Sequence, residues 1–172
     1  MASTWRCPVC GAEREVLHDP LGLLAQTPRR LAYLLRGLSP QQLARRPAEG
    51  EWSIQEVVCH LADAEVVQGF RYRKAMTEEG PEVPPYDQER FAAGLAYLRR
   101  NLPAVQQAYR ALRRANVDLL RAVEPRQLES PIRHPEYGLV TVHQMAQHVV
   151  HHDEAHLRQI MTVKRAIGAR RR

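Results

Sequence analysis

The sequence predicts an all-α protein built as a four-helix bundle. Four long segments carry apolar residues at helical spacing, and most of them begin or end at a recognisable capping residue. Leu, Ala, Arg and Gln are abundant whereas aromatic residues make up only 6% of the chain, a composition that favours helices. The 172 residues suffice for one domain with its own core. We expect an extension over residues 1–19, the bundle over 20–168 and a basic tail over 169–172.

The first two helical segments have clear boundaries. Six leucines recur at helical spacing from residue 23 to residue 38, and a glycine stops this first helix near residue 37. A short helical turn is expected over residues 39–43. The second long helix begins at a capping box formed by Ser53 and Glu56 and runs to about Thr77, because glycine and proline residues follow.

The middle of the chain predicts two further helical pieces. Asp87 is expected to cap one that continues through Leu98. Asn101 then caps the third long helix, which ends before Pro125. The spacing places these apolar residues of the third helix inward: Val105, Leu112, Leu119 and Val123.

The last helix is the longest. Residues 129–140 contain two prolines and a glycine, which predicts an irregular or hairpin-like connection. Thr141 and Gln144 then form a second capping box, and the helix is expected over residues 142–167. No other segment carries a strand pattern that competes with the helical interpretation.

Charge and hydropathy favour an ordinary globular protein. The net charge of +6 raises the possibility of nucleic-acid binding, but the arginines are scattered along helices and in residues 170–172. No apolar run is long enough to span a membrane, and no secretion signal begins the chain. Three cysteines suit a reducing compartment. We therefore expect a soluble cytoplasmic protein without a nucleic-acid or membrane partner.

Four histidines crowd into nine residues of the last helix: His148, His151, His152 and His156. Because each helical residue advances by about 100°, the first, third and fourth of these share one face. Imidazoles at positions i and i+4 can reach one ion, and zinc and similar metals favour neutral imidazole nitrogen. From spacing alone, metal binding and ordinary hydrogen-bonded histidines remain equal alternatives.

A further ligand must come from a facing helix. His60 is the best candidate because it lies in the otherwise apolar stretch of residues 57–62 and is expected to point inward. The alternative is a buried histidine bonded to a carbonyl oxygen. The segment HDEAH at residues 152–156 is comparable to the H-E-x-x-H metalloprotease motif, but its first acid is Asp153 and no sheet accompanies it. Protease activity is therefore disfavoured.

Several motifs together resemble one family. Residues 51–63 read EWSIQEVVCHLAD and resemble the W-S-x-x-E/Q-V-x-x-H-L-x-D signature of the DinB-like superfamily. Three further segments resemble the YfiT-like branch: RYRKAMTE at residues 71–78, PPY at 84–86 and HPEYG at 134–138. The segment HDEAHLRQI is similar to the closing H-x-x-x-H-x-x-Q/H-I motif. The resemblance covers about residues 21–167.

This resemblance implies a fold and a metal site. The family fold is a four-helix bundle, often a homodimer, in which three histidines surround one divalent metal, most often zinc or nickel. Carried onto this sequence, the ligands fall on His60, His152 and His156. His148 would be a pocket residue in the second shell or an alternate ligand. Three protein ligands with one open position are typical of a catalytic metal.

The resemblance also implies metal-dependent chemistry on a small-molecule substrate. DinB-like proteins are often described as hydrolases, and some YfiT-like members transfer low-molecular-weight thiols such as bacillithiol or mycothiol. Asp63 lies three residues after His60, so it is a candidate catalytic residue that orients His60 or accepts a proton; the alternative is a polar residue at the bundle edge. The motifs favour thiol S-transfer over hydrolysis. A non-catalytic metal or small-ligand sensor stays open.

The N-terminal extension carries half of a zinc-binding motif. Cys7 and Cys10 stand in the sequence CPVCG, but a closed structural zinc site needs four ligands. His18 or a second copy of the chain could complete a second zinc site. A thiol–disulfide role lacks the βαβ context that usually surrounds such cysteines. Cys59 is adjacent to His60 and points about 100° away from it, so we do not expect it to be a nucleophile.

Overall fold

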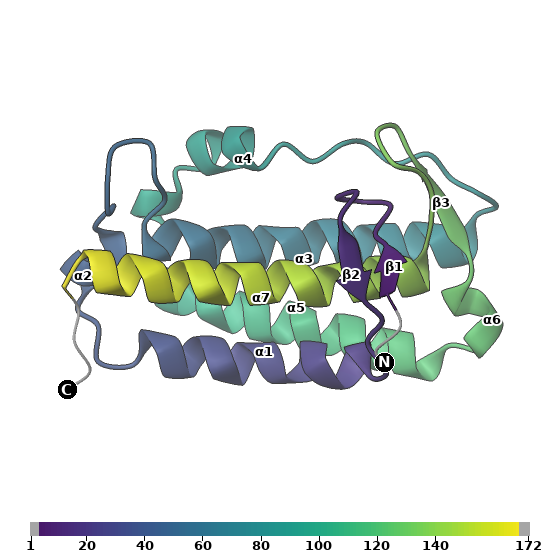
Figure 1. Ribbon diagram of the computed structural model, residues 1–172, viewed down its shortest axis with the longest axis horizontal. Coiled ribbons are helices and arrows are strands. Elements are labelled where there is room, and N and C mark those ends of the chain that lie inside the picture. The colour runs from purple at the N-terminus through teal and green to yellow at the C-terminus, as the bar shows by residue number, and fades with distance from the viewer. Residues whose placement is uncertain (1–3, 169–172) are drawn as a thin grey trace.

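Four long helices pack side by side along most of the molecule (Figure 1). The computed structural model describes residues 4–168. The bundle consists of α1 (Pro20–Leu35), α3 (Ile54–Thr77), α5 (Leu102–Ala122) and α7 (Val142–Ala166). Short helical pieces connect them: α2 (Pro40–Ala44), α4 (Gln88–Gly94), the 3₁₀ turn η1 (Tyr97–Arg99) and α6 (Pro125–Leu128). The predicted four-helix bundle is confirmed.

Both histidine-bearing helices begin where the sequence predicts. The Ser53 hydroxyl accepts a hydrogen bond from the Glu56 N–H at 3.2 Å, and the Glu56 carboxylate accepts one from the Ser53 N–H at 2.8 Å. Thr141 and Gln144 exchange the same pair of bonds at the start of α7. These reciprocal bonds satisfy amides that a helix N-terminus otherwise leaves free, so they fix the first turn of α3 and of α7.

The helical piece expected through Leu98 is interrupted. Helix α4 ends at Gly94, and Ala96 adopts a left-handed conformation with φ of +48° before η1 begins. This turn places Tyr97 in the core, where its ring packs edge-on against Trp52 with centroids 6.5 Å apart. Leu95 and Leu98 stay exposed. The prediction of one continuous piece was therefore wrong, because burial of Tyr97 requires a change of direction.

The inward face of α5 also differs from the prediction. Val105 is buried as expected, but Leu112, Leu119 and Val123 are only half-buried. The fully buried positions include two polar residues, Arg113 and Asn116, which apolar spacing could not select. Buried polar groups require partners, and both side chains find them on neighbouring helices.

Two small hairpins accompany the bundle. Strands β3 (Pro131–His134) and β4 (Gly138–Thr141) pair antiparallel, which confirms the hairpin-like connection before α7. Strands β1 (Thr4–Arg6) and β2 (Glu13–Glu15) form a second hairpin that lies beside α7 and was not predicted (Figure 1). Strands of three residues are too short to show a period-2 pattern. The predicted domain boundaries stay predictions, and the predicted basic tail, residues 169–172, lies outside the described residues.

No helix within residues 4–168 combines the length and the apolar character that crossing a membrane requires.

One buried arginine connects all four helices of the bundle. The Arg113 guanidinium on α5 forms ion pairs with Glu65 on α3 at 2.8 Å and with Asp153 on α7 at 2.6 Å. It also donates to the Leu24 carbonyl oxygen on α1 at 3.2 Å. All three charged side chains are at most 3% exposed. Removing any one of these charged side chains would strongly destabilise the fold, because the charges left behind would be buried without a counter-charge.

We predict that Arg113→Met lowers the free energy of unfolding by about 3–5 kcal/mol, because two carboxylates lose their buried counter-charge. Urea denaturation followed by circular dichroism measures the change. Arg114→Met is the matched control on the same helix. Its side chain is 85% exposed and its ion pair in the described chain, with Asp118 at 3.6 Å, is on the surface, so we expect a change within about 0.5 kcal/mol. Equal stability of the two variants would contradict the prediction.

Candidate metal centre

Three imidazole nitrogens converge between α3 and α7. The Nε2 atom of His60 lies 2.9 Å from Nε2 of His152, which in turn lies 3.1 Å from Nε2 of His156. His152 and His156 are one turn apart on α7, and His60 reaches them from α3. The structure therefore brings together the three histidines that the sequence and the resemblance singled out as metal ligands.

The separations between these nitrogens suit a single ion. Two nitrogens that each lie 2.0–2.1 Å from a tetrahedral zinc are about 3.3 Å apart. The observed distances of 2.9 and 3.1 Å are close to this value. Imidazole nitrogen is a ligand that zinc, nickel and similar divalent metals accept. The donor set can therefore hold one divalent ion without rearrangement of the helices.

Neighbouring side chains hold the imidazole rings in orientation. Nδ1 of His60 lies 3.1 Å from the Tyr86 hydroxyl oxygen, and Nδ1 of His156 lies 2.7 Å from Oε1 of Gln159. When Nε2 binds a metal, Nδ1 carries the proton and donates it to such an acceptor. Nδ1 of His152 lies 4.0 Å from the Asp153 carboxylate. Each ring thus has a polar group close to the nitrogen that faces away from the cluster.

The electrostatics of the cluster keep His60 and His156 neutral. Burial and the neighbouring imidazoles lower the pKa of His60 to about 2 and the pKa of His156 to about 4. Burial alone would raise the pKa of Asp153, but the Arg113 guanidinium lowers it to about 2, so this carboxylate stays charged. Burial raises the pKa of Tyr86 to about 12, so its hydroxyl stays protonated. Neutral imidazole is the form that binds a metal.

A cavity of about 170 Å³ adjoins the cluster. His60, His152, Tyr86 and Arg71 are among the residues that line it. Arg71 is buried, donates to the Pro84 carbonyl oxygen at 3.0 Å and lies 3.3 Å from Nε2 of His134, but it forms no ion pair with a carboxylate among residues 4–168. A substrate could therefore reach the histidine cluster, and the cavity offers it a buried cation.

The buried carboxylates near the cavity are already paired. Glu65 and Asp153 line it, but both are bound by Arg113. Asp63, the candidate catalytic residue, accepts two hydrogen bonds from Arg100, both at 3.0 Å, and is not among the cavity-lining residues of the described chain. Its catalytic role stays a prediction, and the observed partner shows that its charge is engaged elsewhere.

His148 belongs to a different group of side chains. Its Nδ1 atom lies 3.4 Å from Sγ of Cys7, and the donor atoms of Cys7, Cys10 and His148 lie within 4.8 Å of one another. His18, the alternative partner considered for the cysteines, is not part of this group in the described chain. The structure thus places Cys7 and Cys10 next to His148, which also lines the cavity beside the other cluster, with its ring centroid 6.2 Å from that of His152.

Sequence reasoning missed three residues of the site. Tyr86 and Arg71 lie within motifs that resemble the YfiT-like branch and Gln159 lies within the closing motif of the DinB-like family, but those motifs assign them no role. Tyr86 contacts His60 across 26 residues of sequence, and Arg71 meets Pro84 only because the chain after α3 folds back over that helix. The motif position of these residues was the one available signal.

Comparison with known proteins agrees with this geometry. The family model described as the DinB superfamily matches residues 23–160. The chain belongs to the DinB superfamily. Two proteins of Oceanobacillus iheyensis, both named as candidate metal-dependent hydrolases, are similar to it: one is 28% identical over 86% of each chain, and the other is 30% identical over 85% of this chain and 84% of its own.

Solved structures share this fold. YfiT from Bacillus subtilis, described as a candidate metal-dependent hydrolase with an unusual four-helix bundle topology, superposes with a TM-score of 0.82 at 23% identity, covering 90% of this chain and 92% of its own. A mycothiol-dependent maleylpyruvate isomerase superposes with a TM-score of 0.60 at 16% identity, covering 83% and 57%. At these identities the likeness concerns the fold. The homodimer stays a prediction.

We predict that His152→Ala removes one equivalent of bound metal per chain, because its Nε2 is the atom that both other imidazoles approach. Elemental analysis after chelator stripping, reloading and desalting measures the content. His143→Ala is the control: this histidine is also on α7, but its side chain is 46% exposed and it is not in the cluster. Wild-type metal content in the His152 variant would count against the site.

Proposed function

We propose that this chain is a divalent-metal-dependent enzyme that transfers a small thiol to an electrophilic substrate. The observation that carries the proposal is the cluster of His60, His152 and His156 beside a cavity whose buried carboxylates are already paired with arginine. A divalent ion held by these histidines would supply Lewis acidity, which lowers the pKa of a thiol or of water. Zinc and nickel suit the nitrogen donors.

The surroundings of the cluster favour a thiol as nucleophile. The two buried carboxylates in the cavity wall, Glu65 and Asp153, are both committed to Arg113, which leaves the exposed Glu136 as the other carboxylate among the described lining residues. A thiol loses its proton without a strong general base, because its unperturbed pKa is near 8.5. In the reaction the thiol proton goes to solvent, sulfur forms a bond to the electrophilic carbon, and the leaving group departs with the electrons of the broken bond.

Arg71 suggests the chemical class of the substrate. Its guanidinium is buried in the cavity wall without a carboxylate partner in the described chain, and burial lowers its pKa from the usual value. A carboxylate on the thiol or on the electrophile would supply the missing counter-charge with charge-assisted hydrogen bonds. We therefore propose that one of the two reactants bears a carboxylate.

Hydrolysis is the second candidate. The relatives at 28–30% identity carry names of metal-dependent hydrolases, and lowering the pKa of water is a common use of a metal with an open position. In that reaction Tyr86, which is protonated and lies 3.1 Å from His60, would be available to donate a hydrogen bond. The mycothiol-dependent maleylpyruvate isomerase shares the fold of this chain, so the fold is compatible with thiol-dependent chemistry as well as with hydrolysis. A sensor that binds metal without turnover is the remaining alternative.

A paired assay separates these functions. The metal-loaded protein is incubated with monochlorobimane and each of several cellular thiols, and separately with activated esters in the absence of thiol. We expect conjugation that depends on both thiol and metal and that His152→Ala abolishes. Ester hydrolysis without conjugation would overturn the proposal in favour of hydrolysis. Metal binding without turnover in either arm would overturn it in favour of a sensor.

The role of Arg71 gives a further prediction. With a carboxylate-bearing electrophile and a thiol that carries no carboxylate, Arg71→Met should raise KM by about tenfold or more, because a charge-assisted hydrogen bond is lost, while kcat changes less. Arg71→Lys, which keeps the charge, should recover part of the loss. A neutral electrophile of similar reactivity is the control, and its KM should change little. An equal loss with both substrates would show that Arg71 acts only by holding the segment around Pro84.

A further inference from the structure

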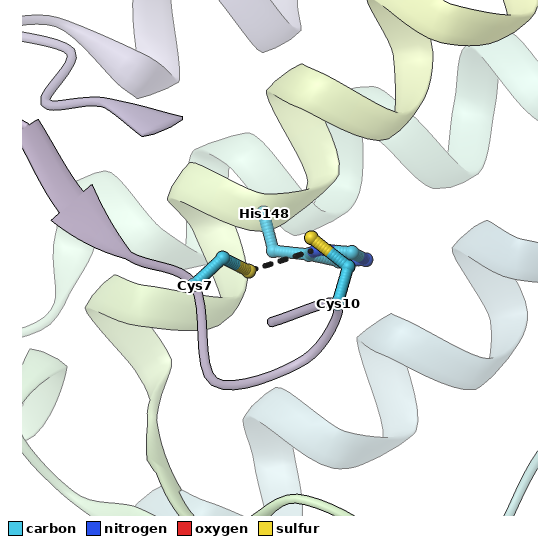
Figure 2. Close-up of side chains that lie close together, drawn as sticks. All are labelled: Cys7, Cys10 and His148. Carbon is cyan, nitrogen blue, oxygen red and sulfur yellow. Dashed lines mark hydrogen bonds between the residues drawn. The ribbon is translucent and has the colours of Figure 1, made fainter. Parts of the chain in front are cut away.

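A second group of metal-ligating side chains joins the N-terminal hairpin to α7 (Figure 2). Cys7 and Cys10 stand on the turn between β1 and β2, and His148 projects toward them from α7. Sγ of Cys7 is 3.4 Å from Nδ1 of His148, and the three donor atoms lie within 4.8 Å of one another. The proposed function uses none of these side chains.

The turn that carries the cysteines has the shape of a metal-binding knuckle. The Gly11 N–H donates to the Cys7 carbonyl oxygen at 2.8 Å, and the Cys7 N–H donates to the Ala12 carbonyl oxygen at 3.0 Å. Gly11 has φ of +66°, a conformation that residues with a side chain rarely adopt. These bonds close a tight loop that brings both sulfur atoms next to His148, with Cys7 fully buried and Cys10 exposed.

We propose that Cys7, Cys10 and His148 hold a zinc ion, separate from the ion assigned to the three-histidine cluster. A sulfur 2.3 Å and a nitrogen 2.0–2.1 Å from one tetrahedral zinc are about 3.6 Å apart, close to the 3.4 Å between Cys7 and His148. Two thiolates and an imidazole form a donor set that selects zinc over magnesium or calcium. Three protein ligands leave one coordination position for a solvent molecule.

The position of His148 distinguishes this site from a redox pair. A disulfide between Cys7 and Cys10 would need no histidine, and both cysteines are free thiols in the structure. The histidine instead comes from α7, 141 residues away in sequence, and its ring nitrogen points at the buried sulfur. Convergence of three soft or borderline donors from two distant segments is what a metal site requires.

A zinc ion here would fasten the hairpin to the bundle. A two-stranded sheet with three residues per strand has little stability of its own. Within the described chain, Val9 packs against the core cluster that includes Val149 of α7, and hydrogen bonds join Gln147 to the backbone of Leu17 and His151 to the Glu15 carbonyl oxygen. Val9, between the two cysteines, lines the cavity beside the three-histidine cluster. The proposed ion would therefore also fix one part of the cavity wall.

Metal stoichiometry of the full chain tests the proposal. The reduced protein is stripped with chelator, reloaded with zinc, desalted and subjected to elemental analysis. We expect two zinc ions per chain in the wild type, one in the double variant Cys7→Ser with Cys10→Ser, and one in His152→Ala. Because the two variants address different clusters, failure of the proposed function and failure of this site are distinguishable. One ion in the wild type, unchanged in the cysteine double variant, would overturn the proposal.

Cobalt substitution identifies the ligands directly. A Co²⁺ ion bound by cysteine gives a sulfur-to-metal charge-transfer absorption, which we expect in the wild type and in His152→Ala but not in the double cysteine variant. His148→Ala should weaken binding and alter this band. Cys59→Ala is the matched control: Cys59 is buried on α3 outside the group, so the band should be unchanged. A band that disappears only in the Cys59 variant would overturn the assignment.

A third experiment measures how far zinc protects the cysteines from alkylation. It uses the wild-type chain, so its result does not depend on whether a variant folds. With zinc bound, iodoacetamide should modify the exposed Cys10 at least tenfold more slowly than in the stripped protein, and chelator should restore the rate. Peptide mass spectrometry locates the modified residue. Equal rates with and without zinc, or a Cys7–Cys10 disulfide forming in the presence of zinc, would contradict the proposed site.

Discussion

The buried guanidinium of Arg113 is the constraint on which the bundle and its site depend. It contacts α3 through Glu65, α7 through Asp153 and α1 through the Leu24 carbonyl, so the four helices share one set of charge-assisted bonds. Asp153 directly follows His152 in the sequence. A shift of α7 against α3 that separated His60 from His152 would therefore also break a buried ion pair, whose loss is costly. The network thus holds the two helices in the register that brings the imidazoles together.

The same network determines the chemical character of the cavity. By binding Glu65 and Asp153, Arg113 removes two acids from the set of available bases, whereas Arg71 stays without an acidic partner in the described chain. Burial lowers the pKa of His60 and of His156, so these two imidazoles are neutral and able to bind a cation. The cavity consequently combines imidazole donors with a buried guanidinium that forms no ion pair in the described chain, although the exposed Glu136 carboxylate lines the same cavity. This combination suits an anionic reactant better than a cationic one.

Local sequence signals predicted what depends on near neighbours. Capping boxes located the starts of α3 and α7, and i, i+4 spacing placed His152 and His156 on one face. The remaining features depend on contacts between distant segments. The burial of Arg113 requires acids 40 and more residues away, and the partner of His148 lies 141 residues away at Cys7. The break at Ala96 follows from the burial of Tyr97, which apolar spacing within one segment does not reveal.

The two clusters on α7 follow from the geometry of the helix itself. Residues at i and i+4 are rotated by about 40° about the axis, so His148 and His156 differ by about 80°. Three histidines at this spacing therefore cannot all face α3 equally. His152 and His156 contact His60. His148 instead faces the N-terminal turn, and its Nδ1 atom lies 3.4 Å from Sγ of Cys7. Because Val9 of that turn lines the cavity, the extension before the bundle is part of the wall around the candidate metal centre rather than a separate appendage.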